Sequence, residues 1–391
     1  MNVTITPTKL CGTVKIPPSK SYSHRALIAA YLGAGSAESV GESEDIRATK
    51  RCLDALSNAA PMDANESGST LRFMLPIALA VNGGAEITGT QKLLSRPLDE
   101  YERIFSTLGI TFSNDGERVR AKGKLKNGVF HLNGNVSSQF ITGLLFALPL
   151  LEGDSEIIVA GDFESIAYVD MTLHIQREAG VDIKRDGTRF YIKGGQSYRK
   201  ADIKVEGDCS QSAFFLAMET VCTNLPHHTL QGDCKIIDIY RAMGMKINEI
   251  PGGFASNGIA TRPIEVDIAQ TPDLAPPLAA VMAVTEGTSR ITNATRLRLK
   301  ESDRIQSIQK SLSAIGAEIF EEGDTLLIKG RLSLCGGVAD SYNDHRIAMA
   351  LAVASQHCVK PLTILGAHCV NKSMPNFWDV FRMLGGKFET D

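Results

Sequence analysis

Basic side chains recur in this sequence where a helix is expected to begin. The stretch PPSKSYSHRAL (residues 17–27) places Lys20 and Arg25 among serines, of which Ser19 and Ser21 are good helix N-caps. A helix N-terminus already carries about half a positive charge, so a cation there is unfavourable by roughly 0.3–1 kcal/mol. Cations at such a place indicate that an anion binds to them.

Three further segments of the first half supply groups that could bind an anion. In ESGSTLR, Gly68 lies between hydroxyls, which suits a phosphate that approaches the backbone, and Arg72 follows one turn later. VSSQF contributes Ser137, Ser138 and Gln139 at the mouth of an apolar helix, and LSRPL contributes Arg96 before a proline. Each segment alone is equally well explained as a cap, a turn or a surface cation, so their coincidence carries the argument.

The second half repeats the pattern with carboxylates added. In KESDR, Lys300 and Arg304 are four residues apart and share one helix face, where like charges are destabilising unless an anion lies between them. In NDHRIAMA, Arg346 falls in the first turn of an apolar helix. TPDLAPP adds Asp273 as an N-cap or a base, and NKSMP adds Lys372, whose alternative is a surface lysine. So many cations predict ligands with several phosphate and carboxylate groups.

The sequence lacks the motifs of most phosphate chemistry. It contains no G-x-x-x-x-G-K-[ST] loop, no strand-linked G-x-G-x-x-G, no G-x-S-x-G elbow and no compact carboxylate cluster for Mg²⁺. Among the cations there remain two carboxylates, Asp273 and Glu301, together with Lys20 and His345. These groups suit proton transfer to and from an anionic small molecule without a cofactor.

The composition is that of an ordinary globular protein. The chain has 391 residues, 43% of them hydrophobic and 22% charged, and its net charge of −3 argues against broad binding to nucleic acid or membranes. We find no signal peptide, and no apolar run approaches the roughly 20 residues of a membrane span. The eight cysteines are scattered without a C-x-x-C pair, so we expect reduced thiols, a cytoplasmic location and no metal site.

One pattern of elements recurs six times, and it must position these residues. Each copy has a polar lead-in, an apolar helix, a glycine, a strand, a second amphipathic helix and a hairpin, although the first copy has a weak tail. Copies of about 65 residues fit the chain length. The first helices are apolar all round and therefore buried, so we expect an α/β (α+β) protein of two compact domains with three βαβαββ repeats each.

The motifs stand in an order that resembles the 5-enolpyruvylshikimate-3-phosphate synthases, a family of enolpyruvyl transferases. They are SKSYSHRAL, ESGSTLRF, SRPL, SSQF, YVDMTL, VEGDCSQSAFFL, TPDLAPPLA, LKESDRI, NDHRIAMA and NKSMPNFW. The resemblance implies two inside-out α/β domains with helices buried and sheets outside. It also implies that residues 1–16 join residues 207–391 in a discontinuous domain, into which residues 17–206 are inserted.

The resemblance further implies a reaction. The family transfers the carboxyvinyl group of phosphoenolpyruvate to the 5-hydroxyl of shikimate 3-phosphate through a tetrahedral intermediate, in the shikimate pathway of aromatic amino-acid biosynthesis, with no cofactor or metal. The catalytic positions match Asp273 as base, Glu301 as proton donor, and Lys20. The positions that bind phosphoenolpyruvate match Lys20, Gly68, Arg96, Gln139, Arg304, Arg346 and Lys372. Those that bind shikimate 3-phosphate match Ser21, Arg25, Ser137, Ser138, Ser165, Asp273 and Lys300. Domain closure would exclude water, and we expect a monomer.

Four places depart from the usual family pattern. They are His24 instead of Asn, Ile166-Ala167 instead of a basic-proline pair, Arg296 instead of Asn, and Met374 instead of an aromatic residue. Because the charged set is intact, these departures bear on substrate affinity and loop geometry and leave the reaction class unchanged.

Two other functions stay open at this point. An enolpyruvyl transferase that acts on UDP-N-acetylglucosamine would need a reactive loop cysteine in the first domain, which holds only Cys52, and would lack the D-H-R motif. A non-enzymatic anion-binding relative would not favour the carboxylates of Asp273 and Glu301 among its cations.

Overall fold

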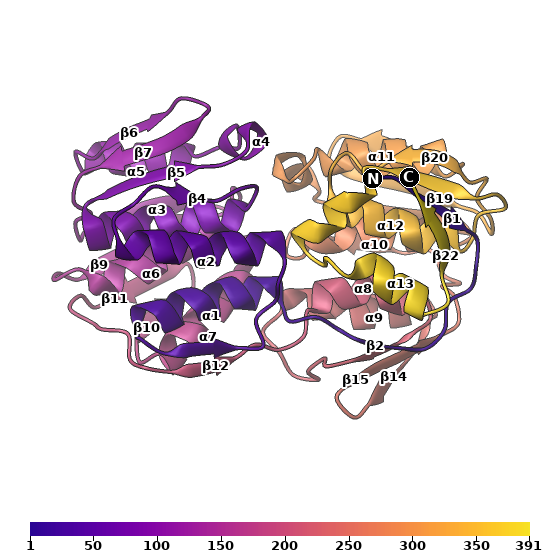
Figure 1. Ribbon diagram of the computed structural model, residues 1–391, viewed down its shortest axis with the longest axis horizontal. Coiled ribbons are helices and arrows are strands. Elements are labelled where there is room, and N and C mark those ends of the chain that lie inside the picture. Colours follow the sequence, from indigo (N-terminus) through magenta and orange to yellow (C-terminus); the bar gives the residue numbers. More distant parts are fainter. The chain divides into compact units, whose positions relative to one another are not determined.

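A computed structural model describes all 391 residues, and the chain forms two compact units (Figure 1). The inserted unit comprises Pro18–Val205, drawn from indigo to magenta. The discontinuous unit comprises Met1–Pro17 and Glu206–Asp391, and it therefore contains both ends of the chain.

The elements of the inserted unit alternate between helices and short strands. Its helices are α1 (Lys20–Leu32), α2 (Glu44–Ser57), α3 (Gly68–Asn82), α4 (Gln91–Leu94), α5 (Asp99–Thr107), α6 (Ser138–Ala147), the 3₁₀ helix η1 (Leu148–Leu150) and α7 (Ile166–Glu178). Its strands are β3 (Ser36–Glu38), β4 (Met62–Asp63), β5 (Gly84–Thr88), β6 (Thr111–Asn114), β7 (Arg118–Lys122), β8 (Val129–Asn133), β9 (Ser155–Ala160), β10 (Ile183–Asp186), β11 (Arg189–Ile192) and β12 (Asp202–Lys204).

The discontinuous unit is built in the same manner. Its helices are α8 (Cys209–Ala217), η2 (Gly232–Lys235), α9 (Ile236–Ala242), η3 (Pro272–Leu274), α10 (Ala275–Ala283), η4 (Thr295–Leu299), α11 (Arg304–Ala314), α12 (His345–Ser355), η5 (Ala367–Lys372) and α13 (Phe377–Met383). Its strands are β1 (Val3–Thr6), β2 (Thr13–Lys15), β13 (Val221–Thr223), β14 (Lys246–Ile250), β15 (Gly253–Asn257), β16 (Glu265–Asp267), β17 (Gly287–Thr292), β18 (Glu318–Glu322), β19 (Thr325–Gly330), β20 (Gly337–Asp340), β21 (Leu362–Leu365) and β22 (Lys387–Thr390).

Five of the six sheets share one topology. Each has four strands, in which one parallel pair is extended by two antiparallel strands, as in the order β4-β5-β7-β6. The first copy forms only the two-stranded parallel sheet β12-β3, which explains its weak tail in the sequence. The N-terminal strand β1 pairs with β21 and β22 and so completes the last sheet. Each unit thus contains three sheets, as the repeat pattern predicts.

The helices lie inside and the sheets outside, because the apolar residues are distributed in that way. In α6, α8, α10 and α12 almost every residue is buried, whereas strands such as β8 alternate between buried and exposed side chains. Each unit has its own hydrophobic core. The predicted inside-out α/β fold is therefore confirmed. None of the helices combines the length and the apolar character required to cross a membrane.

Candidate active site

Arg25 of α1 connects helices α6 and α7 of the inserted unit. Its Nε donates to Thr172 Oγ1 of α7 at 2.8 Å, its Nη2 to Thr142 Oγ1 of α6 at 3.3 Å, and its Nη1 to the Ser21 carbonyl at 2.7 Å. The guanidinium is buried and lies 5.2 Å from the ring centre of Phe73 in α3. The cation predicted to bind substrate is thus held entirely by neutral groups.

Arg72 and Arg96 pack around Gly68 at the start of α3. Arg72 donates to Gln139 Oε1 of α6 at 2.7 Å and to the Pro97 carbonyl at 3.1 Å. A Cβ atom on Gly68 would lie 2.7 Å from Arg96 Nη1 and 3.2 Å from Arg72 Nη1, so only glycine fits without displacing a guanidinium. The Nε of Arg96 is buried and has no hydrogen-bond partner. Two guanidiniums against one glycine form a site suited to a phosphate or carboxylate.

Lys20 is the first residue of α1 and bonds to a carboxylate of α2. Its Nζ lies 2.8 Å from Asp45 Oδ2, and the two side chains are 17% and 13% exposed. The N-cap of α1 is Ser19, whose oxygen accepts from Tyr22 N, and Ser21 lies in the first turn. The ammonium therefore remains accessible to a ligand while one carboxylate fixes its position.

The three remaining serines predicted to bind substrate all lie at helix starts. Ser137 caps α6 by accepting from the N–H of Gln139, and Ser138 is the buried first residue of that helix. A capping hydroxyl still has its own hydrogen to donate, so this role does not exclude phosphate binding. Ser165 precedes α7 with φ of 56°, in the left-handed region.

Arg304 is the centre of the site in the discontinuous unit. This guanidinium is 1% exposed and donates to three carboxylates: Nε to Asp344 Oδ2 at 2.8 Å, Nη1 to Asp273 Oδ1 at 2.8 Å, and Nη2 to Glu301 Oε2 at 2.6 Å. Asp344 is fully buried and also caps α12 by accepting from the N–H of Arg346 at 3.0 Å. The starts of α11 and α12 are thereby locked to each other.

Asp273 is shared among three cations. Besides Arg304, it accepts from Arg346 Nη2 at 2.9 Å, and Lys300 Nζ lies 3.4 Å away. Arg346 Nη2 also donates to Ser210 Oγ of α8 at 3.0 Å. The starts of α8, η3, α11 and α12 thus meet within this unit, and the two predicted proton-transfer carboxylates lie on one guanidinium.

Lys372 is buried, so the alternative interpretation of this residue as a surface lysine is wrong. It ends η5 with 6% exposure, and its Nζ donates to the Asn343 carbonyl at 2.6 Å. Its neighbour Ser373 accepts from Gln211 Nε2 of α8 at 2.5 Å. The loop after β21 is therefore joined to the helix starts that hold the other cations of this unit.

The surrounding charges determine the state of Asp273. Burial alone would raise its pKa, but Arg346, Lys300 and Arg304 outweigh burial and hold the pKa well below its usual range. Burial lowers the pKa of Lys300, although Asp273 opposes this. Asp273 is therefore an ionised carboxylate at neutral pH, and it becomes a stronger base when an anionic ligand takes up part of these positive charges.

Several residues that build the site were not predicted from the sequence. They are Asp45, Thr142, Thr172, Ser210 and Asp344. Thr142 could have been found from the sequence, because a hydroxyl inside an otherwise apolar helix needs a buried partner. Asp344 could also have been found, since it lies two residues before Arg346 at a helix start, where aspartate is a preferred N-cap.

The departures from the family pattern lie in ordered surroundings. Met374 is buried in the core of the discontinuous unit, and Ile166 and Ala167 form the first turn of α7. Arg296 lies in η4, and His24 is buried in α1. Of the four, Arg296 acts on the charged set directly, because its positive charge adds to the effect of burial in lowering the pKa of Lys300.

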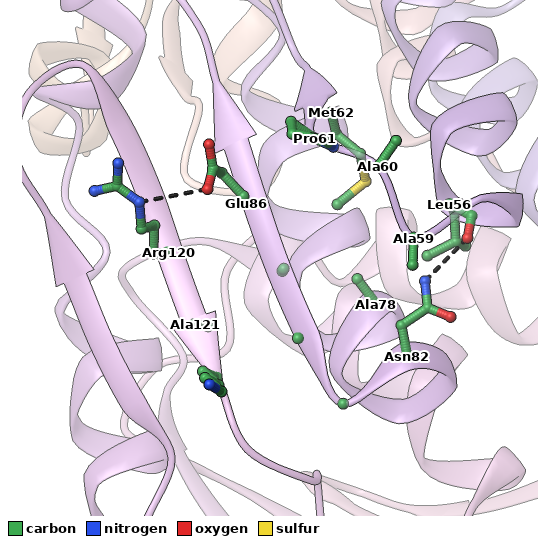
Figure 2. A pocket seen from close by; sticks show the side chains of 14 residues that line it. Leu56, Ala59, Ala60, Pro61, Met62, Ala78, Asn82, Glu86, Arg120 and Ala121 are labelled. Atoms are coloured by element: carbon green, nitrogen blue, oxygen red, sulfur yellow. Dashed lines mark hydrogen bonds and ion pairs between the residues drawn. The ribbon is translucent and has the colours of Figure 1, made fainter.

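A separate pocket of about 450 Å³ lies in the inserted unit between the ends of α2 and α3 and the strands β5 and β7 (Figure 2). Alanines and glycines form much of its wall, beside an ion pair in which Arg120 Nε lies 3.4 Å from Glu86 Oε2. Asn82 Nδ2 donates to the Leu56 carbonyl at 2.9 Å. None of the predicted site residues lines this pocket.

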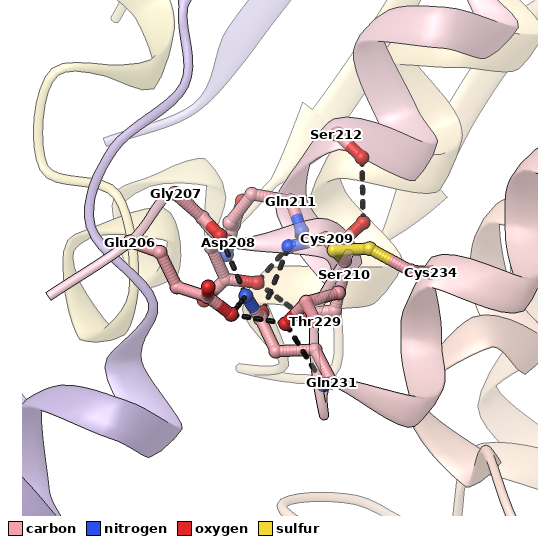
Figure 3. Close-up of a disulfide and its surroundings, with 10 residues drawn as sticks. All are labelled: Glu206, Gly207, Asp208, Cys209, Ser210, Gln211, Ser212, Thr229, Gln231 and Cys234. Atoms are coloured by element: carbon pink, nitrogen blue, oxygen red, sulfur yellow. Dashed lines mark hydrogen bonds between the residues drawn. A yellow bond between two sulfur atoms is a disulfide. The ribbon is translucent and has the colours of Figure 1, made fainter. Parts of the chain in front are cut away.

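The expectation of eight reduced thiols is wrong for one pair. Cys209, the first residue of α8, is bonded to Cys234 in η2 (Figure 3), and the other six cysteines are free. The backbone N–H of Cys209 donates to Gln231 Oε1 at 3.0 Å, which helps to hold the two segments together. The sequence separation of 25 residues gave no C-x-x-C signal.

Comparison with known proteins decides the family. The profile described as EPSP synthase (3-phosphoshikimate 1-carboxyvinyltransferase) matches residues 5–60 and 57–381. The chain belongs to the EPSP synthase family. The 3-phosphoshikimate 1-carboxyvinyltransferase of Clostridium kluyveri is 44% identical over 417 residues, with 99% of this chain and 98% of the relative covered. That of Clostridium novyi is 43% identical, with 98% of each covered.

Solved structures of EPSP synthase agree in fold. The enzyme from Acinetobacter baumannii, solved at 2.37 Å, superposes with a TM-score of 0.78 at 22% identity, with both chains fully covered. The mixed α/β architecture of small sheets around buried helices is therefore that of EPSP synthase.

Within this family, Cys52 lacks the properties of a reactive loop cysteine. It is fully buried in α2, its thiol donates to the Asp63 carbonyl, and burial raises its pKa to about 12. A reactive cysteine needs an exposed thiol with a lowered pKa. Cys52 is therefore not the reactive cysteine that a UDP-N-acetylglucosamine transferase would need.

Proposed function

We propose that this chain acts as a 3-phosphoshikimate 1-carboxyvinyltransferase of the shikimate pathway. It would transfer the enolpyruvyl group of phosphoenolpyruvate to the 5-hydroxyl of shikimate 3-phosphate and release phosphate. The observation that carries the proposal beyond family membership is the combination, in the discontinuous unit, of Asp273 and Glu301 on the guanidinium of Arg304. Two carboxylates on one cation suit an acid and a base that serve one polyanionic complex.

The two substrates would be bound by the cations and hydroxyls at the helix starts. We assign phosphoenolpyruvate to Lys20, Gly68, Arg96, Gln139, Arg304, Arg346 and Lys372. Shikimate 3-phosphate is assigned to Ser21, Arg25, Ser137, Ser138, Ser165, Asp273 and Lys300. Both assignments draw on the N-terminal ends of helices, whose N–H groups and dipoles favour anions.

The chemical steps then require the protein only to transfer protons and to stabilise charge. Asp273 takes the proton of the 5-hydroxyl as its oxygen bonds to C2 of phosphoenolpyruvate, while Glu301 delivers a proton to C3. The tetrahedral adduct next returns a proton from C3 to the Glu301 carboxylate as its C–O bond to phosphate breaks, which forms the enol ether and releases phosphate. Lys20 and the arginines stabilise the negative charge of the phosphate as it leaves. Closure of the domains around both substrates would exclude water from the adduct.

The decisive assay is the release of phosphate from phosphoenolpyruvate by the purified chain. We expect release that depends on added shikimate 3-phosphate and is absent when UDP-N-acetylglucosamine replaces it. Turnover with the UDP-sugar alone would identify the other transferase. No turnover with either acceptor, from protein that binds phosphoenolpyruvate, would identify a non-enzymatic anion-binding relative.

We further propose a monomer that acts in the cytoplasm on these small molecules and binds neither nucleic acid nor membranes. The net charge of −3 supports the absence of a nucleic-acid or membrane surface. The disulfide Cys209–Cys234 would be unusual for this location, since disulfides are rare in the cytosol. Alkylation of thiols in intact cells followed by mass spectrometry would test the location through the state of this pair.

A further inference from the structure

A chain of hydrogen bonds between buried side chains connects three helices of the inserted unit. Two of these helices carry groups that are proposed to bind phosphoenolpyruvate. His24 Nδ1 lies 2.7 Å from Thr49 Oγ1, which lies 2.7 Å from Thr70 Oγ1. Thr70 Oγ1 donates to Ser67 Oγ at 2.7 Å. All four residues are at most 1% exposed. The chain begins in α1, passes through α2 and ends at the N-cap of α3.

Counting hydrogens fixes the direction of this chain. Each threonine hydroxyl has one hydrogen to donate. Thr70 uses its hydrogen on Ser67, so the single hydrogen of Thr49 goes either to Thr70 Oγ1 or to the Asp45 carbonyl, which lies 3.3 Å from Thr49 Oγ1. Thr49 can then only accept from His24, whose Nδ1 must carry a hydrogen.

The surroundings of the other ring nitrogen, Nε2, indicate that the imidazole of His24 is uncharged and carries its only ring N–H hydrogen on Nδ1. Nε2 is buried without a hydrogen-bond partner, and the ring meets Phe73 edge-on at 6.3 Å between centres. A charged imidazole would carry a hydrogen at Nε2 with no acceptor, beside the cations Lys20 and Arg25 of the same helix. His24 is therefore a neutral donor toward Thr49.

We infer that His24 is a positioning residue for phosphoenolpyruvate binding, through Thr49 and without touching the substrate. Lys20 lies one turn before His24 in α1, and its partner Asp45 lies one turn before Thr49 in α2. Gly68 directly follows Ser67, the last member of the chain. The chain thus fixes the spacing of the helix starts that carry Lys20 and Gly68. The inference rests on the proposed function, because that function assigns these two groups to phosphoenolpyruvate.

The departure of His24 from the usual family Asn acquires a physical meaning here. The side-chain amide of Asn carries its nitrogen at the same number of bonds from the backbone as Nδ1 of His, and it can donate to Thr49 in the same way. Leucine has similar bulk but cannot donate. The pair of variants His24→Asn and His24→Leu therefore separates the hydrogen bond from the packing.

The test measures steady-state kinetics of His24→Leu, His24→Asn and Thr49→Val beside unfolding of each protein in urea. We expect His24→Leu and Thr49→Val to raise KM for phosphoenolpyruvate by about tenfold, with a smaller change in KM for shikimate 3-phosphate, since small displacements of binding groups weaken binding strongly. His24→Asn should restore KM to within about twofold of the parent protein, since its amide keeps the donor. A merely structural residue would lower stability and leave KM of the folded enzyme unchanged, and that result would overturn the inference.

Two further outcomes bear on the inference independently. If His24→Leu does not fold, Thr49→Val keeps the question open to measurement, because valine preserves the shape of threonine and removes only the hydroxyl. Nitrogen NMR of the parent protein, with His24 assigned by the Asn variant, should show hydrogen on Nδ1 and none on Nε2. Hydrogen on Nε2 would overturn the inference. The NMR result can be obtained even if the protein has no enzymatic activity. Failure of the proposed function can therefore be distinguished from failure of this inference.

Discussion

In the inserted unit the buried guanidinium of Arg25 is held by hydroxyls and a carbonyl, whereas in the discontinuous unit that of Arg304 is held by three carboxylates. Burial lowers the pKa of Arg25 to about 10, because no carboxylate repays its lost hydration. Burial has the same tendency at Arg304, but Asp344, Glu301 and Asp273 outweigh it and raise the pKa above its ordinary value.

The difference suggests a division of labour between the two units. A cation without a carboxylate partner is least stable when the protein is empty, so an arriving phosphate gains the most by binding to it. A cation surrounded by carboxylates instead holds the proton-transfer groups in place, and together with its neighbouring cations it keeps Asp273 ionised. We therefore expect changes in the inserted unit to alter mainly substrate binding and turnover, and changes in the discontinuous unit to alter stability as well.

The largest effect is expected for Lys20→Met in the inserted unit. Loss of the ammonium should reduce turnover by about 100- to 1000-fold, since a charge that stabilises the transition state contributes on that scale. Unfolding in urea should change little, because the side chain is partly exposed and methionine retains its packing. The exposed Lys92→Met is the matched control and should retain full activity. Near-normal turnover of Lys20→Met would show that the site is misplaced.

The next effect compares the two buried arginine environments directly. Asp344→Leu removes a carboxylate of Arg304 and the cap of α12, and should lower the free energy of unfolding by about 3–5 kcal/mol. Arg25→Met should change it by less than about 1 kcal/mol, because the two threonines left behind can bond to each other at their present 3.1 Å.

Each unit has its own reporter for this comparison. The single tryptophan, Trp378, lies in α13 and reports unfolding of the discontinuous unit by fluorescence. Hydrogen exchange of amides in α1, α6 and α7 reports the inserted unit. Equal losses from the two variants would contradict the distinction between the units.

The fold was predictable from the sequence to a greater extent than the details of the site. Periodic lead-ins and apolar helices such as FITGLLFALPLL report burial directly, so the repeats and the inside-out arrangement followed from local pattern. The partners of the cations did not, because contacts such as Lys20 with Asp45 or Arg25 with Thr172 depend on which helix faces which. The pairing of Cys209 with Cys234 could not be predicted for the same reason.

The disulfide provides a further difference between the units, since both of its cysteines lie in the discontinuous unit. Reduction should lower the free energy of unfolding of this unit by about 3 kcal/mol, the value expected for opening a loop of this length. Trp378 fluorescence in urea, with and without dithiothreitol, measures the change. The variant with both cysteines replaced by serine should not respond to dithiothreitol. Eight reactive thiols in unfolded, unreduced protein would contradict the bond.

Gly68→Ala should have a smaller effect, confined to binding. The added Cβ would displace the guanidiniums of Arg96 and Arg72, so we expect KM for phosphoenolpyruvate to rise by about tenfold, a free-energy change of about 1.4 kcal/mol. Gly41→Ala is the matched control, because the nearest atom to its Cβ would be 3.9 Å away. An unchanged KM in Gly68→Ala would mean that the two arginines do not bind this substrate.

The last comparison distinguishes the units by their response to pH, an effect that is smallest near neutral pH. Burial, with Lys20 and Arg25 nearby, holds the pKa of His24 well below its usual value, so the folded inserted unit keeps this ring neutral. Below about pH 6.5 the unfolded chain binds a proton there that the native state does not, and stability falls by up to about 1.4 kcal/mol for each further pH unit.

Asp273 and Asp344 have the opposite relation, because their pKa values in the folded state lie below those of the unfolded chain. Their contribution is complete above about pH 4 and is lost only as the pH falls further. Between pH 6.5 and 4.5 hydrogen exchange should therefore accelerate in α1, α2 and α3 of the inserted unit. Trp378 should report a smaller change in the discontinuous unit, where burial also lowers the pKa of His357, although less strongly than that of His24. In His24→Asn the acceleration should disappear. An equal pH response in that variant would assign the effect to another group, and the neutral His24 on which the hydroxyl chain depends would then lack support from stability.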